Sequence, residues 1–295
     1  MSGSAQTGSF ASVLGGHMRL ARISNLPTVI TNVTAGAALA GALSGDAFSP
    51  LALLVLSLAM GLFYTAGMYL NDIADYAVDC KERPERPLPQ DILSRKTALS
   101  FVIGYFVVGL LLVGYARPLA IVPGVALVAV IILYDYWHKQ NPFSHWIMAL
   151  TRSLVYVTVF VALGGTDVGH LLVAAVLMLL YVAGLTYIAR SETQVDFRRY
   201  WPILLLLLPA IYFGYQTRGF FLLVPVAFVL WCGWSLWFVY RRENTSIGSG
   251  IVRLIAGIAL LDALVIAADG FGLLTAAAIG MFMLTRSLQG YVAGS

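Results

Sequence analysis

The sequence predicts an all-α protein, a polytopic bundle of nine to ten transmembrane helices. Three observations carry this prediction: 60% of the 295 residues are apolar, only 11% are charged, and the mean hydropathy is +0.85. A soluble domain has about 25% charged residues, and here the apolar stretches follow one another without a polar block of domain size. The composition therefore excludes an ordinary water-soluble enzyme and indicates one integral-membrane domain.

Ten apolar stretches approach the length of about 20 helical residues that crosses the hydrocarbon core of a bilayer. They are residues 27–46, 49–70, 97–115, 118–135, 146–164, 168–188, 201–217, 219–240, 251–269 and 270–288. Only Gly270 and its neighbours separate the last two stretches, so nine spans stay possible. We expect residues 1–17 to form a flexible N-terminal tail, residues 18–290 the membrane domain, and residues 291–295 a C-terminal tail.

The basic residues indicate which side of the membrane carries the chemistry. With the N-terminus in the cytoplasm, only Arg117 and Arg218 of the 18 lysines and arginines lie near the outer turns. Positive charge is retained in cytoplasmic loops. We therefore expect a multi-pass protein of the cell (inner) membrane, with its active site facing the cytoplasm.

An acidic motif follows the second predicted span. The helical pattern continues from Asn71 to Asp79, and Asp72, Asp75 and Asp79 are three and four residues apart, so they share one helix face. Ionised groups at the membrane boundary are expensive to desolvate, and a cluster of them predicts cation binding. Mg²⁺ takes one or two carboxylates plus phosphate oxygens, and the basic loop 81–89 that follows offers arginines suited to phosphate. The alternative is a solvated charged loop.

The run Asn71-Asp72-x-x-Asp75-x-x-x-Asp79, followed by Arg83-Pro84-Glu85-Arg86-Pro87-Leu88-Pro89, resembles the first aspartate-rich motif of the UbiA superfamily of membrane prenyltransferases. Arg19, Arg22 and Asn25-Leu26-Pro27 are similar to the family's segment before its first helix. The resemblance implies a UbiA-like bundle whose cytoplasmic mouth binds Mg²⁺ and a polyprenyl diphosphate donor. The implied partners are that donor, an acceptor of unknown identity and membrane lipid, and we expect no nucleic acid.

The resemblance also implies roles for individual residues. The catalytic residues would be Asn71, Asp72, Asp75 and Asp79; the Mg²⁺ ligands Asp72, Asp75, Asp79, Glu192 and Asp196; and the diphosphate-binding residues Lys81, Arg83, Arg86, Lys139, Arg152 and Arg190. Mg²⁺-assisted ionisation would then release diphosphate, and an acceptor carbon or hydroxyl would attack the allylic cation.

The segment after the sixth predicted span departs from the family pattern. Typical members carry a second aspartate-rich motif there, but this sequence has only Glu192 and Asp196, four residues apart. Arg190 is an alternative that would contact the diphosphate directly, and the segment is similar to an EboC-like branch of the superfamily. Three hypotheses stay open: a two-site prenyltransferase, an altered member with the same substrate class, and a UbiA-like lipid-binding, isoprenoid-binding or transport protein without transferase activity.

Several further residues have two possible interpretations. Arg152, inside the fifth span, either pairs with Asp72, Asp75 or a diphosphate, or forms a structural ion pair, because an unpaired guanidinium in a membrane is costly. Asp262 fits a protonated acid that bonds across helices, and it is left outside the site. Lys139 either approaches the diphosphate or snorkels to the interface. His138 and His145 are predicted to be ordinary interface residues. A set of aromatic residues either lines a prenyl channel or packs in the core: Tyr64, Tyr69, Tyr156, Phe160, Tyr181 and Tyr187.

Overall fold

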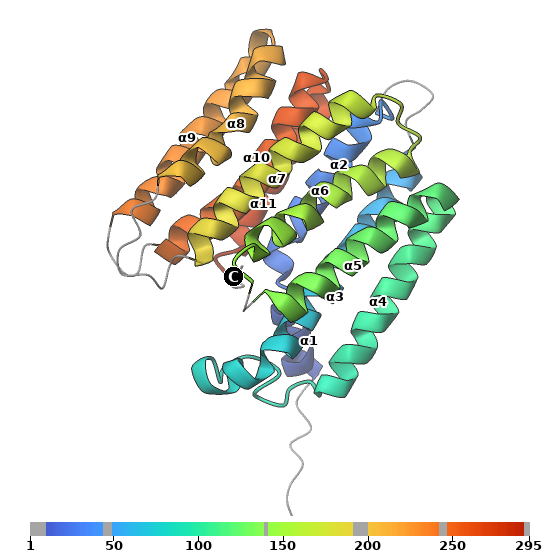
Figure 1. The fold of residues 1–295 in the computed structure, drawn as a ribbon, viewed down its shortest axis with the longest axis vertical. Helices are drawn as coiled ribbons and strands as arrows, with labels where there is room; N and C mark the ends of the chain where they lie inside the picture. The colour runs from blue at the N-terminus through green and yellow to red at the C-terminus, as the bar shows by residue number, and fades with distance from the viewer. Residues whose placement is uncertain (1–9, 44–48, 139–140, 191–199, 242–246, 292–295) are drawn as a thin grey trace, which may run out of the picture.

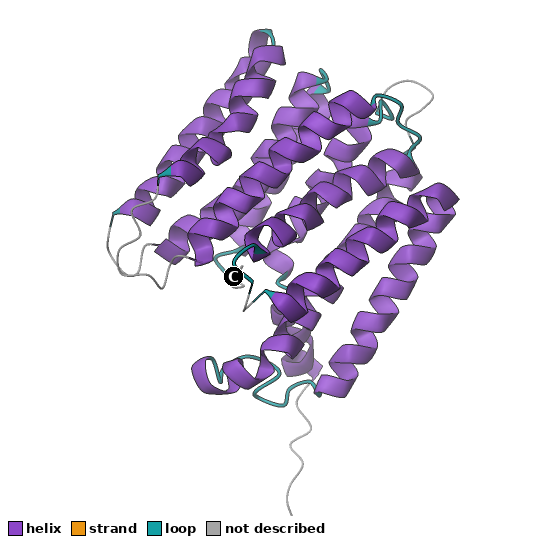
Figure 2. Ribbon diagram, viewed as in Figure 1, coloured by secondary structure: helices purple, strands orange, loops and turns teal. Residues whose placement is uncertain are grey.

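Helices form almost all of the protein. The computed structural model describes residues 10–43, 49–138, 141–190, 200–241 and 247–291, and within these ranges it contains α-helices, short 3₁₀ turns and loops but no strand (Figure 2). The predicted all-α fold class is confirmed.

Ten helices correspond in order to the ten predicted spans (Figure 1). They are α2 (Leu26–Leu39), α3 (Pro50–Glu82), α4 (Arg95–Ala116), α5 (Ile121–Trp137), α6 (Ser144–Ala162), α7 (Val168–Arg190), α8 (Trp201–Gln216), α9 (Leu223–Tyr240), α10 (Ile247–Ala268) and α11 (Gly272–Leu288). Gly270 has a φ of +82°, which glycine adopts without strain, and it separates α10 from α11. By length and composition, seven helices of the described chain can cross a membrane; α8 and α11 are apolar but shorter.

Helix starts follow from local sequence. Ser49 caps α3, because its Oγ accepts a hydrogen bond from the Ala52 amide at 3.2 Å, and Pro50 occupies the first turn. Ser94 caps α4 in the same way through the amide of Thr97 at 3.1 Å. These caps fix where the long α3 begins and where the loop after it ends.

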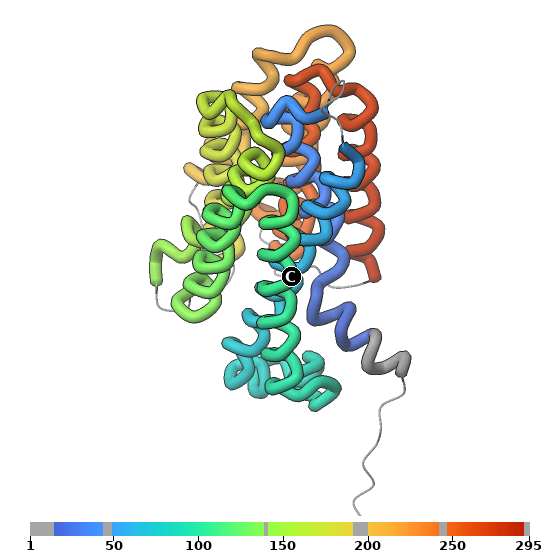
Figure 3. Tube along the Cα trace, turned by 90° about the vertical axis from the view of Figure 1, so that its right-hand side faces the viewer, coloured from blue at the N-terminus to red at the C-terminus, as the bar shows by residue number. Residues whose placement is uncertain are grey.

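Consecutive helices pack side by side, and α2 lies inside the bundle in contact with α3, α6, α10 and α11 (Figures 1 and 3). Small residues allow this central position. A Cβ at Gly36 of α2 would lie 2.9 Å from the Cβ of Val159 on α6, so only glycine lets the two helices approach this closely.

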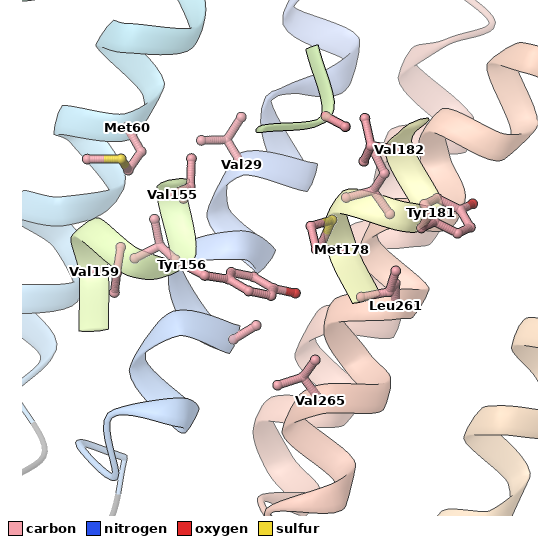
Figure 4. Close-up of a cluster of buried hydrophobic side chains, with 14 of the residues drawn as sticks. Val29, Met60, Val155, Tyr156, Val159, Met178, Tyr181, Val182, Leu261 and Val265 are labelled. Atoms are coloured by element: carbon pink, nitrogen blue, oxygen red, sulfur yellow. The ribbon is translucent and has the colours of Figure 1, made fainter. Parts of the chain in front are cut away.

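The core is built where α2, α3, α6, α7 and α10 meet (Figure 4). Tyr156 reaches from α6 with its hydroxyl directed between α2 and α10, while Tyr181 of α7 donates a hydrogen bond to the Leu254 carbonyl at 2.8 Å. Gly257 makes room for that hydroxyl, because a Cβ there would lie 2.4 Å from it. Both buried tyrosines therefore satisfy their polar atoms inside the membrane domain.

Phe10–Leu20, which overlap the predicted N-terminal tail, form helix α1. His17 Nδ1 lies 2.6 Å from the Tyr69 hydroxyl, and α1 packs against α3. Gly16 allows α1 to pack closely, because a Cβ there would lie 2.7 Å from Ile92 Cγ2.

Helix α3 is long enough to leave the membrane. Its 33 residues span about 50 Å at 1.5 Å per residue, against a hydrocarbon core of about 30 Å. Its last turns, the loop to α4 and α1 project together from one end of the bundle (Figures 1 and 3). The acidic motif lies on this projecting part.

Candidate active site

A polar cleft of about 640 Å³ opens where α3, α5 and α7 end and α10 begins. It is lined by Arg19, Arg22, Asn71, Asp72, Asp75, Arg83, Glu85, Arg86, Pro87, Tyr134, His138, Thr186, Ala189, Arg190, Gly248, Ile251 and Tyr291. The cleft thus brings together residues from both ends of the chain and from the acidic motif and basic loop that the sequence singled out.

Asp72 lies buried between two arginines. Its Oδ1 is 3.4 Å from Arg22 Nη2 and 3.3 Å from Arg86 Nη1, and Arg86 also donates to Asp79 Oδ2 at 2.7 Å. Arg22 occupies a left-handed backbone conformation (φ +42°, ψ +52°) at the turn between α1 and α2, which is uncommon for a residue with a side chain. This turn places the Arg22 guanidinium against α3. Arg22 and Arg86, which we call the clasp on Asp72, hold positive charge at the mouth of the cleft.

Across the cleft, α5 faces the acidic face of α3. Asn71 Nδ2 donates to Asp135 Oδ1 at 3.3 Å, and His138 Nε2 lies 3.8 Å from Asp75 Oδ1. Asp135 is buried, and its Oδ2 has no hydrogen-bond partner among the described residues. A buried oxygen in this state is costly, so it marks a place where a ligand or ion can complete the site.

The remaining predicted residues differ in position. Arg83 and Arg190 line the cleft, and Arg190 donates to the Asn141 carbonyl at 2.9 Å and to Ser144 Oγ. Lys81 is exposed and is not among the residues lining the cleft. Three of the predicted residues lie outside the described part of the chain: Lys139, Glu192 and Asp196. In the described part, no three His, Cys, Asp or Glu side chains are grouped to hold a metal ion by themselves.

An apolar channel of about 120 Å³ continues from the cleft between α2, α3, α5 and α6. Arg22, Asn71 and Tyr134 line both spaces. Deeper in, the channel is lined by residues such as Met60, Phe63, Leu127 and Val155. The cleft and the channel therefore adjoin, and charged and apolar surroundings meet at these residues.

The predicted aromatic set contributes little to the channel. Tyr64 lines it, whereas the other members line neither the channel nor the cleft. Tyr156, Phe160 and Tyr181 belong to the core, and Tyr69 contacts His17. Packing is therefore the role of most of these rings.

Arg152 does not pair with Asp72 or Asp75, and this part of the prediction is wrong. Its guanidinium donates to Asn32 Oδ1 at 2.8 Å and to Thr28 Oγ1 at 3.2 Å. Asn32 in turn donates to Asp262, which also accepts from Thr31 at 2.5 Å and from Tyr156 at 2.6 Å. We call these six residues the Asp262 network. Arg152 ends this network at the wall of the channel.

Several residues of the site have no role that the sequence alone indicates. Arg22 was noted only as part of the family resemblance, and His138 was expected at the interface, although it faces Asp75. Asp135 carried a usable signal, because a carboxylate inside an apolar span is expensive and usually functional. Its contact with Asn71 joins residues 64 positions apart, which spacing along one helix does not reveal.

The fold and the cleft define an all-helical, integral-membrane protein in which a charged cleft opens onto an apolar channel. A sequence model of the UbiA prenyltransferase family matches residues 29–255, and the chain belongs to this family. The resemblance found in the acidic motif is thereby confirmed.

Known proteins give two further likenesses. A digeranylgeranylglyceryl phosphate synthase of Sulfolobus acidocaldarius is 37% identical over 111 residues, which are 36% of this chain and 39% of that protein. The match thus spans about two fifths of the relative's length. A solved structure concerned with digeranylgeranylglyceryl phosphate synthase in membranes has a TM-score of 0.63 at 18% identity, covering 87% of this chain and 99% of that one.

A UbiA homolog from Archaeoglobus fulgidus, solved bound to DMAPP and Mg²⁺, has a TM-score of 0.52 at 15% identity and covers 92% of this chain and 99% of that one. At such identities both structural likenesses show a shared fold.

Proposed function

We propose that the protein transfers an isoprenyl group from its diphosphate to an acceptor hydroxyl, with Mg²⁺ bound in the polar cleft. One observation carries the proposal: in the cleft Asp72 lies between Arg22 and Arg86, and Arg22 also lines the apolar channel. An allylic diphosphate has the complementary form, a multiply charged head on a hydrocarbon chain. Binding would place the head among the arginines and the chain between α2, α3, α5 and α6.

The donor atoms of the cleft fit Mg²⁺ shared between protein and diphosphate. This ion takes one or two carboxylates and completes its shell with water and phosphate oxygens, so a cage of protein ligands is not needed. Asp75 and Asp135 would hold it, because Asp135 Oδ2 is a buried oxygen without a partner in the described chain. Asp72 and Asp79 would serve chiefly to orient Arg86. When bound, Mg²⁺ would neutralise charge that develops on the diphosphate.

The chain's own residues would promote departure of the diphosphate. The allylic C–O bond breaks, and its electron pair leaves with the diphosphate toward Arg22 and Arg86, where positive charge is already in place. The acceptor oxygen forms the new C–O bond, and its proton passes to the released diphosphate. Channel side chains such as Phe63 and Met60 would keep water away from the allylic cation.

The names of the relatives support a particular acceptor. Digeranylgeranylglyceryl phosphate is a glyceryl phosphate that carries two geranylgeranyl chains, and the Sulfolobus protein is named as its synthase. We propose geranylgeranyl diphosphate as the donor and geranylgeranylglyceryl phosphate as the acceptor. The excess of lysine and arginine at the end of the bundle that carries the cleft supports a cytoplasmic active site.

The test is turnover of the purified protein in lipid nanodiscs, with this donor and acceptor, measured as diphosphate release and as ether product by mass spectrometry. We expect turnover with Mg²⁺ and none with EDTA, and we expect Asp75→Asn to lower the rate at least about 30-fold, about 2 kcal/mol of transition-state stabilisation.

The matched control is Asp167→Asn, outside the cleft, where either side chain can accept the hydrogen bond that the His170 amide donates at 3.0 Å. Equal rates for the two variants would refute the role of Asp75. Diphosphate release without an ether product would refute the acceptor while leaving the donor chemistry intact.

A further inference from the structure

A second cavity lies away from the active site, between α9, α10 and α11. This lateral groove has a volume of about 830 Å³, and its lining includes Trp231, Trp234, Leu260, Phe282 and Met283. None of the residues that line it lines the polar cleft or the channel. Its lining is almost wholly apolar, and Trp234 and Met283 are more than half exposed. The groove therefore opens on the surface that faces lipid.

Two arginines stand beside the groove's tryptophans. The guanidinium carbon of Arg253 lies 5.0 Å from the ring centroid of Trp234 and 3.9 Å from that of Phe238. Arg286 lies 5.7 Å from the ring centroid of Trp231. The Trp231 indole donates to the Arg253 carbonyl at 2.9 Å, which fixes the ring between the two charges. Neither arginine lines the groove itself, but both lie beside the tryptophans at one of its ends.

These charges lack an anion in the described chain. Arg253 Nε and Nη1 are buried without a hydrogen-bond partner, and no described carboxylate lies within 4.0 Å of either guanidinium. Arg286 bonds to the neutral side-chain amide of Gln289 at 2.6 Å, and the two arginines repel each other electrostatically. Aromatic faces attract a cation but supply no full negative charge. A shared anion would relieve both the repulsion and the unmet hydrogen bonds.

The depth of the arginines matches a lipid headgroup. Arg253 lies six residues into α10, about 9 Å from its start at 1.5 Å per residue, and Arg286 is two residues from the end of α11. The start of α10 and the end of α11 both lie at the end of the bundle that carries the polar cleft. A headgroup there would be followed by a chain running along the groove toward Phe220 and Thr275 near the opposite end.

We propose that the lateral groove binds one anionic membrane phospholipid, with its phosphate between Arg253 and Arg286 and one hydrocarbon chain along Trp231 and Trp234. Basic pockets between transmembrane helices bind anionic headgroups, and arginine is the residue best suited to grip phosphate. The apolar groove accounts for a lipid rather than a free phosphate ion. The site is independent of the proposed transferase reaction.

The experiment titrates delipidated protein with phosphatidylglycerol or with phosphatidylcholine of the same chains, and counts bound lipid by native mass spectrometry. We expect one phosphatidylglycerol to bind at least about five-fold more tightly than phosphatidylcholine. Combined Arg253→Gln and Arg286→Gln should reduce this preference to about one, whereas Arg253→Lys with Arg286→Lys, which keeps the charge, should retain most of it. The control pair Arg117→Gln and Arg218→Gln, at the opposite end, should behave as the unaltered protein.

A second measurement locates the chain and does not depend on turnover. Phosphatidylglycerol brominated on its chain should quench tryptophan fluorescence, and Trp231→Phe with Trp234→Phe should remove most of the quenching. Inorganic phosphate at the same concentration should not displace the lipid. Equal binding of the two phospholipids, unchanged preference in the double glutamine variant, or release by inorganic phosphate would each overturn the proposal.

Discussion

Two polar clusters lie within this mainly apolar bundle, and they differ in how completely their charges are paired. In the Asp262 network the carboxylate is fully buried, and both of its oxygens accept hydrogen bonds from Thr31, Asn32 or Tyr156. In the polar cleft two arginines crowd Asp72, and at the adjoining end of the channel Asp135 keeps an oxygen without a partner in the described chain. A buried network that is complete holds helices together. An open cluster that is incomplete is where a ligand supplies the missing contacts.

The largest expected effect is a loss of turnover when the polar cleft, and not the Asp262 network, is altered. Asp72→Asn should lower turnover about 100-fold, about 2.7 kcal/mol, because Arg22 and Arg86 lose the charge that positions them. The melting temperature should change little, because asparagine has the same size and keeps one side-chain oxygen that accepts from the two arginines. Steady-state rates and thermal melts of the same preparation check this. A large fall in melting temperature would make Asp72 a structural residue.

A change in the Asp262 network should lower the stability of the fold. Asp262→Ala should destabilise the folded protein by about 2 kcal/mol, because Thr31, Asn32 and Tyr156 lose their common acceptor inside the membrane domain. Unfolding in a denaturing detergent series measures the difference. If stability were unchanged while turnover fell as far as in Asp72→Asn, the Asp262 network would belong to the active site and the comparison would fail.

A smaller effect tests how the cleft uses its basic residues. Arg86→Gln should raise the KM for the donor about 10-fold, about 1.4 kcal/mol, because a charge-assisted contact with diphosphate is lost. Arg83→Gln is the comparison, since Arg83 also lines the cleft but forms no ion pair with a described carboxylate. Equal KM changes in the two variants would indicate that position within the cleft, and not the clasp on Asp72, sets affinity.

The smallest effect concerns one hydrogen bond. Tyr156→Phe removes the donor that lies 2.6 Å from Asp262 Oδ1 and leaves the ring in the core. Hydrogen bonds between membrane helices average about 0.6 kcal/mol, so the loss in stability should be near that value with turnover unaltered. A loss as large as that of Asp262→Ala would show that the tyrosine alone carries the network.

The fold can be predicted from the sequence because each membrane helix is identified separately by its own apolar stretch. An apolar run bounded by polar loops is a local signal, and all ten predicted spans have a helix. Helix α1 is not predicted from the sequence because the contact that explains it is not local: a Cβ at Gly16 would meet Ile92, in the loop after α3.

The site was predictable only along single helices. Helical spacing predicts that Asp72, Asp75 and Asp79 share one face of α3. Arg86, which pairs with Asp72 and Asp79, lies only a few residues further along the chain. The contact of Arg22, in the turn between α1 and α2, with Asp72 and the contact of Asp135 of α5 with Asn71 depend on how the helices pack. The spacing of residues along one helix does not reveal such contacts. For the same reason spacing does not show that Arg152, one of whose two interpretations was a pair with Asp72 or Asp75, bonds instead to Thr28 and Asn32 of α2, 124 and 120 residues away.

The length of α3 has a consequence for kinetics. Because about 50 Å of helix carries the acidic motif past the end of a core of about 30 Å, a donor can reach the cleft while its headgroup stays hydrated and its tail stays among other lipid tails. Enzyme and donor would then meet by diffusion in two dimensions. The quantity that saturates the reaction is in that case the mole fraction of donor in one leaflet, so adding inert lipid should slow turnover by surface dilution even when the donor concentration in the sample is constant.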